Sequence, residues 1–179
     1  MSDPHVLEWN NDFFLKWSDF EAESNPAVFE DSHSTIKYRF TWIVSSEKID
    51  DQIMFLIDDI RLFVEFHPLL SWVRPFQSND NLLKHEQGIF DLAELVKREN
   101  LKLLQDIFYG KRFPTRGKNE PQQKQFAKED SGKMIAKEVE KLEKIFEKKR
   151  HEYTEQTNFG QNQEKQSEYN LMFEKLRQL

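Results

Sequence analysis

Apolar and polar residues alternate along residues 34–46, so that one face of this segment is apolar and the other polar. A period of two, with β-branched and aromatic side chains, predicts a half-buried strand. The apolar face consists of Ile36, Tyr38, Phe40, Trp42 and Val44, and the polar face of Lys37, Arg39 and Thr41.

Two further segments before residue 79 also favour strands. Residues 53–66 are rich in β-forming residues and Pro68 follows them, which predicts a strand ending near Phe66. Within it, the Asp58-Asp59 pair indicates a turn or a bulge. Residues 13–20 form a shorter strand candidate. Together these segments predict a small, mostly antiparallel sheet.

Near residue 79 the spacing of apolar residues changes to three and four, which is typical of helices. Asn79 or Asp80 is a candidate N-cap, and Gly110 a candidate end signal after Tyr109. The spacing predicts one inward stripe, made of Leu82, Leu83, Glu86, Ile89, Phe90, Ala93, Val96 and Leu101.

The rest of the chain predicts a loop and two more helices. The first helix has an apolar stripe through Ile135, Val139, Leu142, Phe146 and Tyr153, and the second, from about Glu164 to Leu179, has Tyr169, Met172, Phe173 and Leu176 facing inward. We therefore expect one α+β domain over residues 1–179, divided into mainly strands (1–78), a motif helix (79–110), a loop (111–123) and a helical part (124–179).

Composition restricts the function classes. The chain has 179 residues, no cysteine and a net charge of −6. The absence of cysteine excludes disulfides and thiolate metal sites. The negative charge argues against general nucleic-acid binding. No apolar run reaches transmembrane length, and the first residues carry no signal-peptide pattern, so we expect no membrane insertion and a cytoplasmic location.

The candidate chemistry lies in "LLKHEQGIFDLAEL" (82–95), where His85 and Glu86 are adjacent in the predicted helix. Zinc peptidases use His-Glu-x-x-His because residues four apart share one helix face. Two imidazoles there bind one zinc, and the Glu between them polarises the attacking water. In this chain the second His position is occupied by Ile89. An isolated His-Glu pair is more often an ordinary surface or core histidine.

The order of the surrounding motifs resembles a family of predicted bacterial zinc-dependent peptidases, known mainly as a domain of unknown function. Members carry Ser-Trp-Val, then His-Glu-Gln-Gly-His-Phe-Asp-Ile-Ala-Glu, then Tyr-Asp-x-x-Thr-x-His-Gly, then Gln-x-x-Trp. The resemblance covers nearly the whole chain, including "LEWNNDFFLKWSDF" (7–20). The matching residues are Ser71, Trp72, Val73, His85, Glu86, Gln87, Gly88, Phe90, Asp91, Ala93, Glu94, Tyr153, Thr157, Gly160 and Gln166.

The departures from the family fall on the presumed metal ligands. The resemblance implies a zincin-type fold, zinc as the cofactor, His85 as a ligand and Glu86 as the general base. Ile89 and Phe159 occupy the two other ligand positions, while Thr154 replaces an Asp and Tyr169 a Trp. Catalytic zinc takes about three protein ligands, so His85 is a relict ligand, Glu86 a relict general base, and we expect no bound cofactor.

Other residues offer little to rebuild the site. Asp91 lies nearly opposite His85 on a helix, and Glu94 is too far along it to share one ion. We therefore expect salt-bridging or capping roles for both carboxylates. His67 and His151 lie outside the motifs.

Two contacts are predicted for the residues at the former metal site that the resemblance implies. Glu86 needs a partner, because an unpaired buried charge is costly, and His85, Tyr153 or a nearby Lys are the candidates. Ile89 and Phe159 should contact one another or His85, as a hydrophobic plug in the place of the metal, with a His85 ring nitrogen turned to a polar group.

The remaining features favour structural roles. Trp9, Trp17, Trp42 and Trp72 are candidates for a ligand pocket, but strand spacing favours core packing. Residues 140–153 are charged like a coiled coil, but their stripe is too short for several heptads. The basic loop 111–118 is typical of a solvated loop.

Three hypotheses for function remain. The first is a non-catalytic relative of the peptidase family with a binding or structural role, whose candidate partners are proteins and peptides. The second is a metal-dependent hydrolase with a site rebuilt around His85 and Glu86. The third is a helical protein-interaction module.

Overall fold

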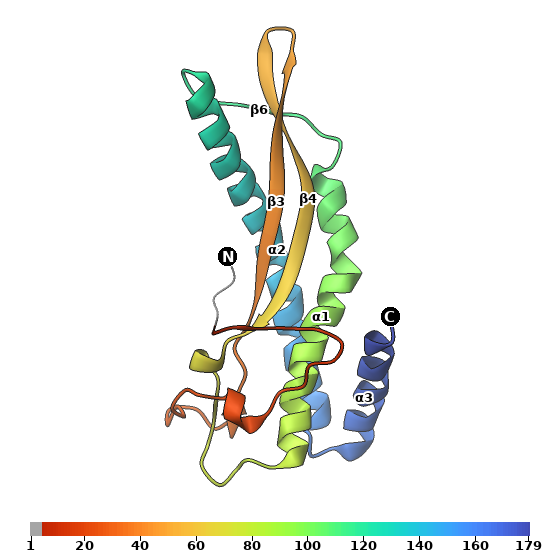
Figure 1. Cartoon of the computed structure of the whole chain (residues 1–179). Helices are drawn as coiled ribbons and strands as arrows, with labels where there is room; N and C mark the ends of the chain where they lie inside the picture. The colour runs from red at the N-terminus through yellow and green to blue at the C-terminus, as the bar shows by residue number, and fades with distance from the viewer. Residues whose placement is uncertain (1–4) are drawn as a thin grey trace.

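A long β-hairpin and two long helices set the elongated shape of the molecule (Figure 1). The computed structural model describes residues 5–179. Strand β3 (Ile36–Ile49) pairs antiparallel with β4 (Gln52–Phe66), in a register that runs from Ile36 opposite Phe66 to Ile49 opposite Gln52. Both long predicted strands are confirmed.

The hairpin turn and the bulge each depend on aspartates in the left-handed region. Asp50 and Asp51, with φ of 49° and 65°, make the turn between β3 and β4. Two positive φ angles in a two-residue loop match the right-handed twist of a hairpin. The register then shifts between Thr41 and Ile43, opposite Asp59, whose φ is 50°. The bulge expected at Asp58-Asp59 is therefore confirmed.

Four short strands complete the sheets. β1 (Leu7–Glu8) and β6 (Phe113–Pro114) pair with opposite ends of β4, so β4 lies inside a sheet of order β1-β4-β3. β2 (Ser32–His33) and β5 (Trp72–Val73) form a separate two-stranded sheet. The antiparallel pairing was expected, but these two-residue strands carry no periodic signal.

The strand predicted over residues 13–20 is wrong. This segment is irregular and contains the 3-10 helix η1 (Trp17–Asp19). Its backbone donors bind side chains instead of a neighbouring strand: Leu15 N–H donates to Gln87 Oε1 at 2.7 Å, and Lys16 N–H donates to Asp19 Oδ2 at 2.8 Å. A second 3-10 helix, η2 (Pro68–Leu70), follows β4.

Three α-helices make up most of the chain after β5, and each is capped at its N-terminus by an asparagine. α1 (Asp80–Phe108) begins after Asn79, whose side chain accepts from Leu82 N–H at 2.9 Å. α2 (Glu120–Thr157) and α3 (Gln163–Arg177) begin after Asn119 and Asn162. The loop predicted to reach residue 123 is therefore too long. The sequence pattern placed Pro121 in the loop, but proline is favoured in the first turn of a helix.

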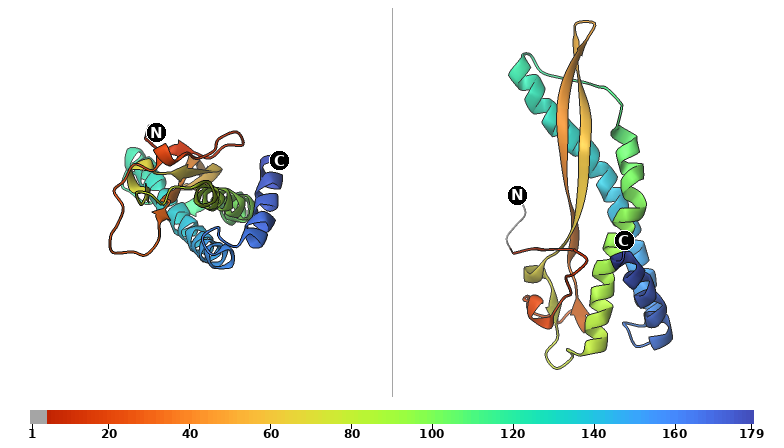
Figure 2. Two further views of the ribbon diagram at one scale, coloured as in Figure 1. Left: turned by 90° about the horizontal axis from the view of Figure 1, so that it is seen from below. Right: turned by 45° about the vertical axis from the view of Figure 1, so that its right-hand side comes forward.

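The helices lie together on one side of the hairpin. α1 and α2 run antiparallel to each other, and α3 packs beside their lower ends (Figures 1 and 2). The fold is α+β, with a small antiparallel sheet. Among residues 5–179, no helix is both long and apolar enough to cross a membrane.

The first half of α1 is enclosed on every side, which differs from the single inward stripe that its sequence predicts. Every residue from His85 to Glu94 is buried. The sheet, the N-terminal segment, α2 and α3 together cover this stretch; Phe66, for example, packs on Phe90 with ring centroids 5.9 Å apart. Polar residues in the stretch therefore need partners within the protein.

Tyr109 connects the end of α1 to the bulge of β4 through a hydrogen bond, and this contact provides a test of the fold. The buried Ile60 N–H donates to Tyr109 Oη at 2.8 Å. We expect Tyr109→Phe to lower the free energy of unfolding by about 1–3 kcal/mol, because it leaves a buried N–H without an acceptor. Urea denaturation measures this. Tyr169→Phe is the matched control, since its hydroxyl bonds to an exposed Gln156. Equal losses in both variants would contradict the role of Tyr109.

Candidate functional site

The candidate site lies in the lower half of the molecule, where the first turns of α1 meet β2, the end of α2 and the start of α3 (Figure 1). His85 and Glu86 are both buried, with exposed fractions of 1% and 3%. Being adjacent on a helix, they point to different neighbours. His85 contacts α2 and α3, and Glu86 contacts the segment around β2.

Glu86 is bound by two serine hydroxyls. Ser32 Oγ donates to Glu86 Oε1 at 2.5 Å, and Ser34 Oγ donates to Glu86 Oε2. Alternate residues of an extended segment share one side, so the Ser-His-Ser sequence directs both hydroxyls at one carboxylate. The expected partners of Glu86, namely His85, Tyr153 or a lysine, are wrong, because the carboxylate faces β2.

His85 is held by a network from the two C-terminal helices. Its ring stacks on Tyr153, with centroids 4.6 Å apart and an interplanar angle of 6°. Nδ1 lies 3.3 Å from Thr157 Oγ1 and 3.4 Å from Gln166 Oε1. The Thr157 hydroxyl itself donates to the Tyr153 carbonyl at 2.7 Å. Both oxygens facing Nδ1 therefore act as acceptors, which places the imidazole proton on Nδ1.

Two glycines permit the close approach of these elements. A Cβ at Gly88 would lie 2.1 Å from Tyr153 Oη, and one at Gly160 would lie 3.1 Å from the Cβ of His85. Gly160 also has a φ of +87°, a conformation open to glycine. The end of α2 and the turn that follows it therefore approach α1 closely beside His85.

Phe159 lies beside His85, as expected, but does not fill a buried plug. Its ring centroid is 6.1 Å from that of His85, within the range of packed aromatic pairs. Asn158 and Phe159 are both left-handed, with φ of 46° and 56°, and this turn brings the side chain back towards α1. Phe159 is 41% exposed, so the plug prediction is wrong on burial. It covers His85 at the surface, beside an open hollow of about 390 Å³.

The donors at the site do not fit a zinc ion. Ile89, four residues after His85, is buried and has no lone pair to donate. Across residues 5–179, no group of three His, Cys, Asp or Glu side chains is arranged to hold a metal ion. Tetrahedral zinc needs about three such protein ligands. His85 brings one imidazole, and both oxygens of Glu86 already accept hydrogen bonds.

The other carboxylates of the motif helix form ion pairs, as predicted. Asp91 Oδ1 lies 2.7 Å from Arg177 Nη2 and accepts from Trp9 Nε1 at 2.8 Å. Glu94 Oε1 lies 3.1 Å from Arg98 Nε. Neither carboxylate points to His85.

The remaining candidates lie apart from the site. His151 is exposed and pairs with Glu155 at 3.0 Å, and His67 precedes η2 at the end of β4. The tryptophans are dispersed, which favours their structural reading: Trp9 donates to Asp91, Trp17 to the Asn79 carbonyl and Trp42 to Ser131, while Trp72 packs near His33.

Sequence reasoning missed four residues around Glu86: Ser32, His33, Ser34 and Arg150. His33 Nδ1 lies 3.4 Å from Arg150 Nη2, and burial together with this guanidinium lowers the pKa of His33. The Ser-His-Ser alternation was the available signal, but a two-residue strand gives no period by which to recognise it.

Comparison of the chain with protein-family models, with curated proteins and with solved structures finds no match.

The buried histidines predict a pH dependence of stability. Burial lowers the pKa of His85 below its ordinary value of 6.5. The unfolded chain therefore binds the proton more readily, and stability falls as the pH drops below 6.5 towards the folded-state pKa, by at most about 1.4 kcal/mol per pH unit for one proton. His33 acts in the same direction.

Unfolding free energies measured between pH 7 and pH 5 check this. His85→Gln should reduce the slope, because it removes the buried imidazole. An unchanged slope in His85→Gln would contradict a neutral, buried His85.

Proposed function

We propose that this protein is a catalytically inactive relative of zincin-like peptidases, whose scaffold serves binding or structure in place of hydrolysis. The observation that carries the proposal is the convergence of the motif residues on His85. Tyr153 stacks on the ring, Thr157 and Gln166 face Nδ1, and Gly160 allows the close approach. Tyr153 and Thr157 come from α2, Gln166 from α3 and Gly160 from the turn between them, and their meeting at His85 supports the proposal.

The tautomer and orientation of the His85 imidazole also support its descent from a zinc ligand. A zinc-bound histidine donates its second ring N–H to a neighbouring acceptor, which fixes the tautomer and orients the ring. His85 has this arrangement, since Nδ1–H faces Thr157 and Gln166, and Nε2 carries the lone pair. Such outer contacts remain where the partner ligands have become Ile89 and Phe159.

The two catalytic requirements are both unmet. A hydrolytic zinc site needs three protein donors, and a general base needs access to the attacking water. Ile89 and Phe159 remove two donors. Glu86 is only 3% exposed and is bound at both oxygens by Ser32 and Ser34. A site rebuilt around His85 would need two further donors beside it, and the described side chains supply none.

Zinc titration tests the proposal directly. Isothermal titration calorimetry of the wild-type chain should show no tight one-to-one binding, because one imidazole is too few ligands. The same protein should show no peptidase activity with zinc added. Tight stoichiometric binding that is lost in His85→Ala, but kept in the exposed His151→Ala, would overturn the proposal.

Restoring the missing ligands tests the inherited geometry. Ile89→His combined with Phe159→His should raise zinc affinity on the order of 100-fold over wild type, since two imidazoles join His85. Calorimetry measures the affinity, and circular dichroism confirms folding. Ile89 is buried, so Phe159→His alone, at an exposed position, provides a second test with a smaller gain. No gain in either folded variant would count against the proposed ligand positions.

A further inference from the structure

The far end of the molecule from His85 carries an unpaired strand edge. β3 is the outer strand of its sheet, and its 14 residues pair only with β4 among residues 5–179. An edge strand presents a row of backbone N–H and C=O groups that can pair with another chain. Proteins commonly protect such edges with charged residues, and on β3 these residues are Lys37, Arg39, Glu47 and Lys48, which leaves residues 40–46 without a charge.

A groove runs along this edge, between β3 and the first turns of α2. It has a volume of about 710 Å³ and is lined by Trp42, Ile43, Val44 and Ser46 from β3 and by Glu120, Lys124, Ala127 and Lys128 from α2. The upper, N-terminal end of α2 leans away from the hairpin (Figures 1 and 2). Strand and helix thus form two walls, and the strand wall has a free edge.

Trp42 closes the lower end of the groove. Its Nε1 donates to Ser131 Oγ at 2.8 Å, and Lys128 Nζ lies 3.8 Å from the ring centroid. Lys128 Nζ also donates to the Trp42 carbonyl at 3.4 Å. The backbone carbonyl of Trp42, on the β3 edge, therefore points towards α2. Beyond this point Ile43 is 54% exposed, so the strand wall offers apolar surface as well as backbone groups.

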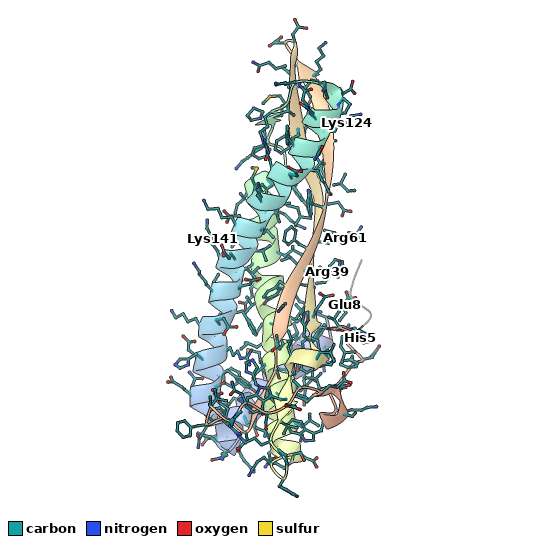
Figure 3. The ribbon with its side chains drawn as sticks, turned by 90° about the vertical axis from the view of Figure 1, so that its left-hand side faces the viewer. His5, Glu8, Arg39, Arg61, Lys124 and Lys141 are labelled. Atoms are coloured by element: carbon teal, nitrogen blue, oxygen red, sulfur yellow. The ribbon has the colours of Figure 1, made fainter. Side chains whose placement is uncertain are left out.

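The helix wall offers positive charge at a spacing that suits a strand. Lys124 and Lys128 are one turn apart, about 6 Å along the axis, and Figure 3 shows Lys124 beside the hairpin. Alternate residues of a strand are about 6.6 Å apart. Acidic residues at positions i and i+2 of an added strand would therefore face both lysines. Glu120 pairs with Lys124 at 3.4 Å, but both side chains are largely exposed, so this pair is weak.

We propose that this groove binds an extended, acidic peptide segment of a partner protein, which adds a strand to the edge of β3. Backbone hydrogen bonds to β3 provide affinity, as in other cases of strand addition. Lys124 and Lys128 select acidic side chains on the inner face of the added strand. The groove and the site at His85 share no residues, so this inference does not rest on the proposed loss of zinc chemistry.

A second copy of the chain fits this groove less well. Pairing two β3 edges would bring Lys37, Arg39 and Lys48 of each strand together, against a single Glu47. Like charges across paired strands are destabilising. An acidic peptide carries the charge opposite to that of these strand residues and to that of Lys124 and Lys128 in the groove.

The test uses the full chain and a fluorescein-labelled peptide of sequence Thr-Glu-Val-Glu-Val-Glu-Thr, followed by fluorescence anisotropy. We expect saturable binding, with amide shifts in the nuclear magnetic resonance spectrum confined to β3 residues 43–48 and the start of α2. The counterpart peptide with lysine in place of glutamate should not bind. Lys124→Glu with Lys128→Glu should weaken binding about tenfold or more.

Two controls separate strand addition from simple charge attraction. Lys144→Glu with Lys148→Glu makes the same change, one turn apart, at exposed positions lower on α2, and should leave affinity unchanged. N-methylation of alternate amides in the peptide should abolish binding for one of the two alternating sets, because that set would donate to β3.

Four results would overturn the proposal. They are equal binding of the lysine peptide, equal weakening by the two lysine pairs, tolerance of both N-methylated sets, or amide shifts away from β3. A stable dimer detected by sedimentation, with the β3 edge protected from hydrogen exchange, would assign the edge to a second copy instead.

Discussion

The burial of polar side chains on the first half of α1 is the constraint on which the rest of the structure depends. A buried carboxylate or imidazole without a partner costs several kcal/mol, so each one requires a donor or acceptor from an enclosing element. Glu86 binds Ser32 and Ser34, and His85 faces Thr157 and Gln166. Each enclosing segment is thus fixed to α1 by at least one polar contact as well as by apolar packing.

Asp91 shows how such contacts balance burial. Burial raises the pKa of Asp91, while the Trp9 indole N–H, the Arg177 guanidinium and the Gln87 amide act in the opposite direction. Arg177 also donates to the carbonyls of Asn10 and Asn11 at 3.2 and 2.7 Å. One guanidinium therefore joins the N-terminal segment, the motif helix and the end of α3.

Local patterns in the sequence predict the elements but not their enclosure. The period of two in β3, the period of three to four in the helices and the capping role of Asn79 were all predictable, because they depend on neighbouring residues. The segment 13–20 was not, since its backbone bonds to Gln87 far along the chain. The partners of Glu86 lie on a two-residue strand that has no period. The order of motifs singled out Tyr153, Thr157 and Gln166, but their contacts with His85 appear only in the structure. The exposure of Phe159 depends on a left-handed turn.

The contact between Arg177 and the carbonyl of Asn11 also governs when the fold can form during synthesis. The two residues are 166 positions apart, so the whole segment between them must emerge from the ribosome before they meet. The hairpin and the upper parts of α1 and α2 depend on nearer contacts and can form earlier. Before α3 is synthesised, Asp91 and Gly88 are exposed to solvent. The nascent chain therefore exposes the side of α1 that α3 covers in the folded protein. Enclosure of the motif helix therefore requires that α3 has been synthesised.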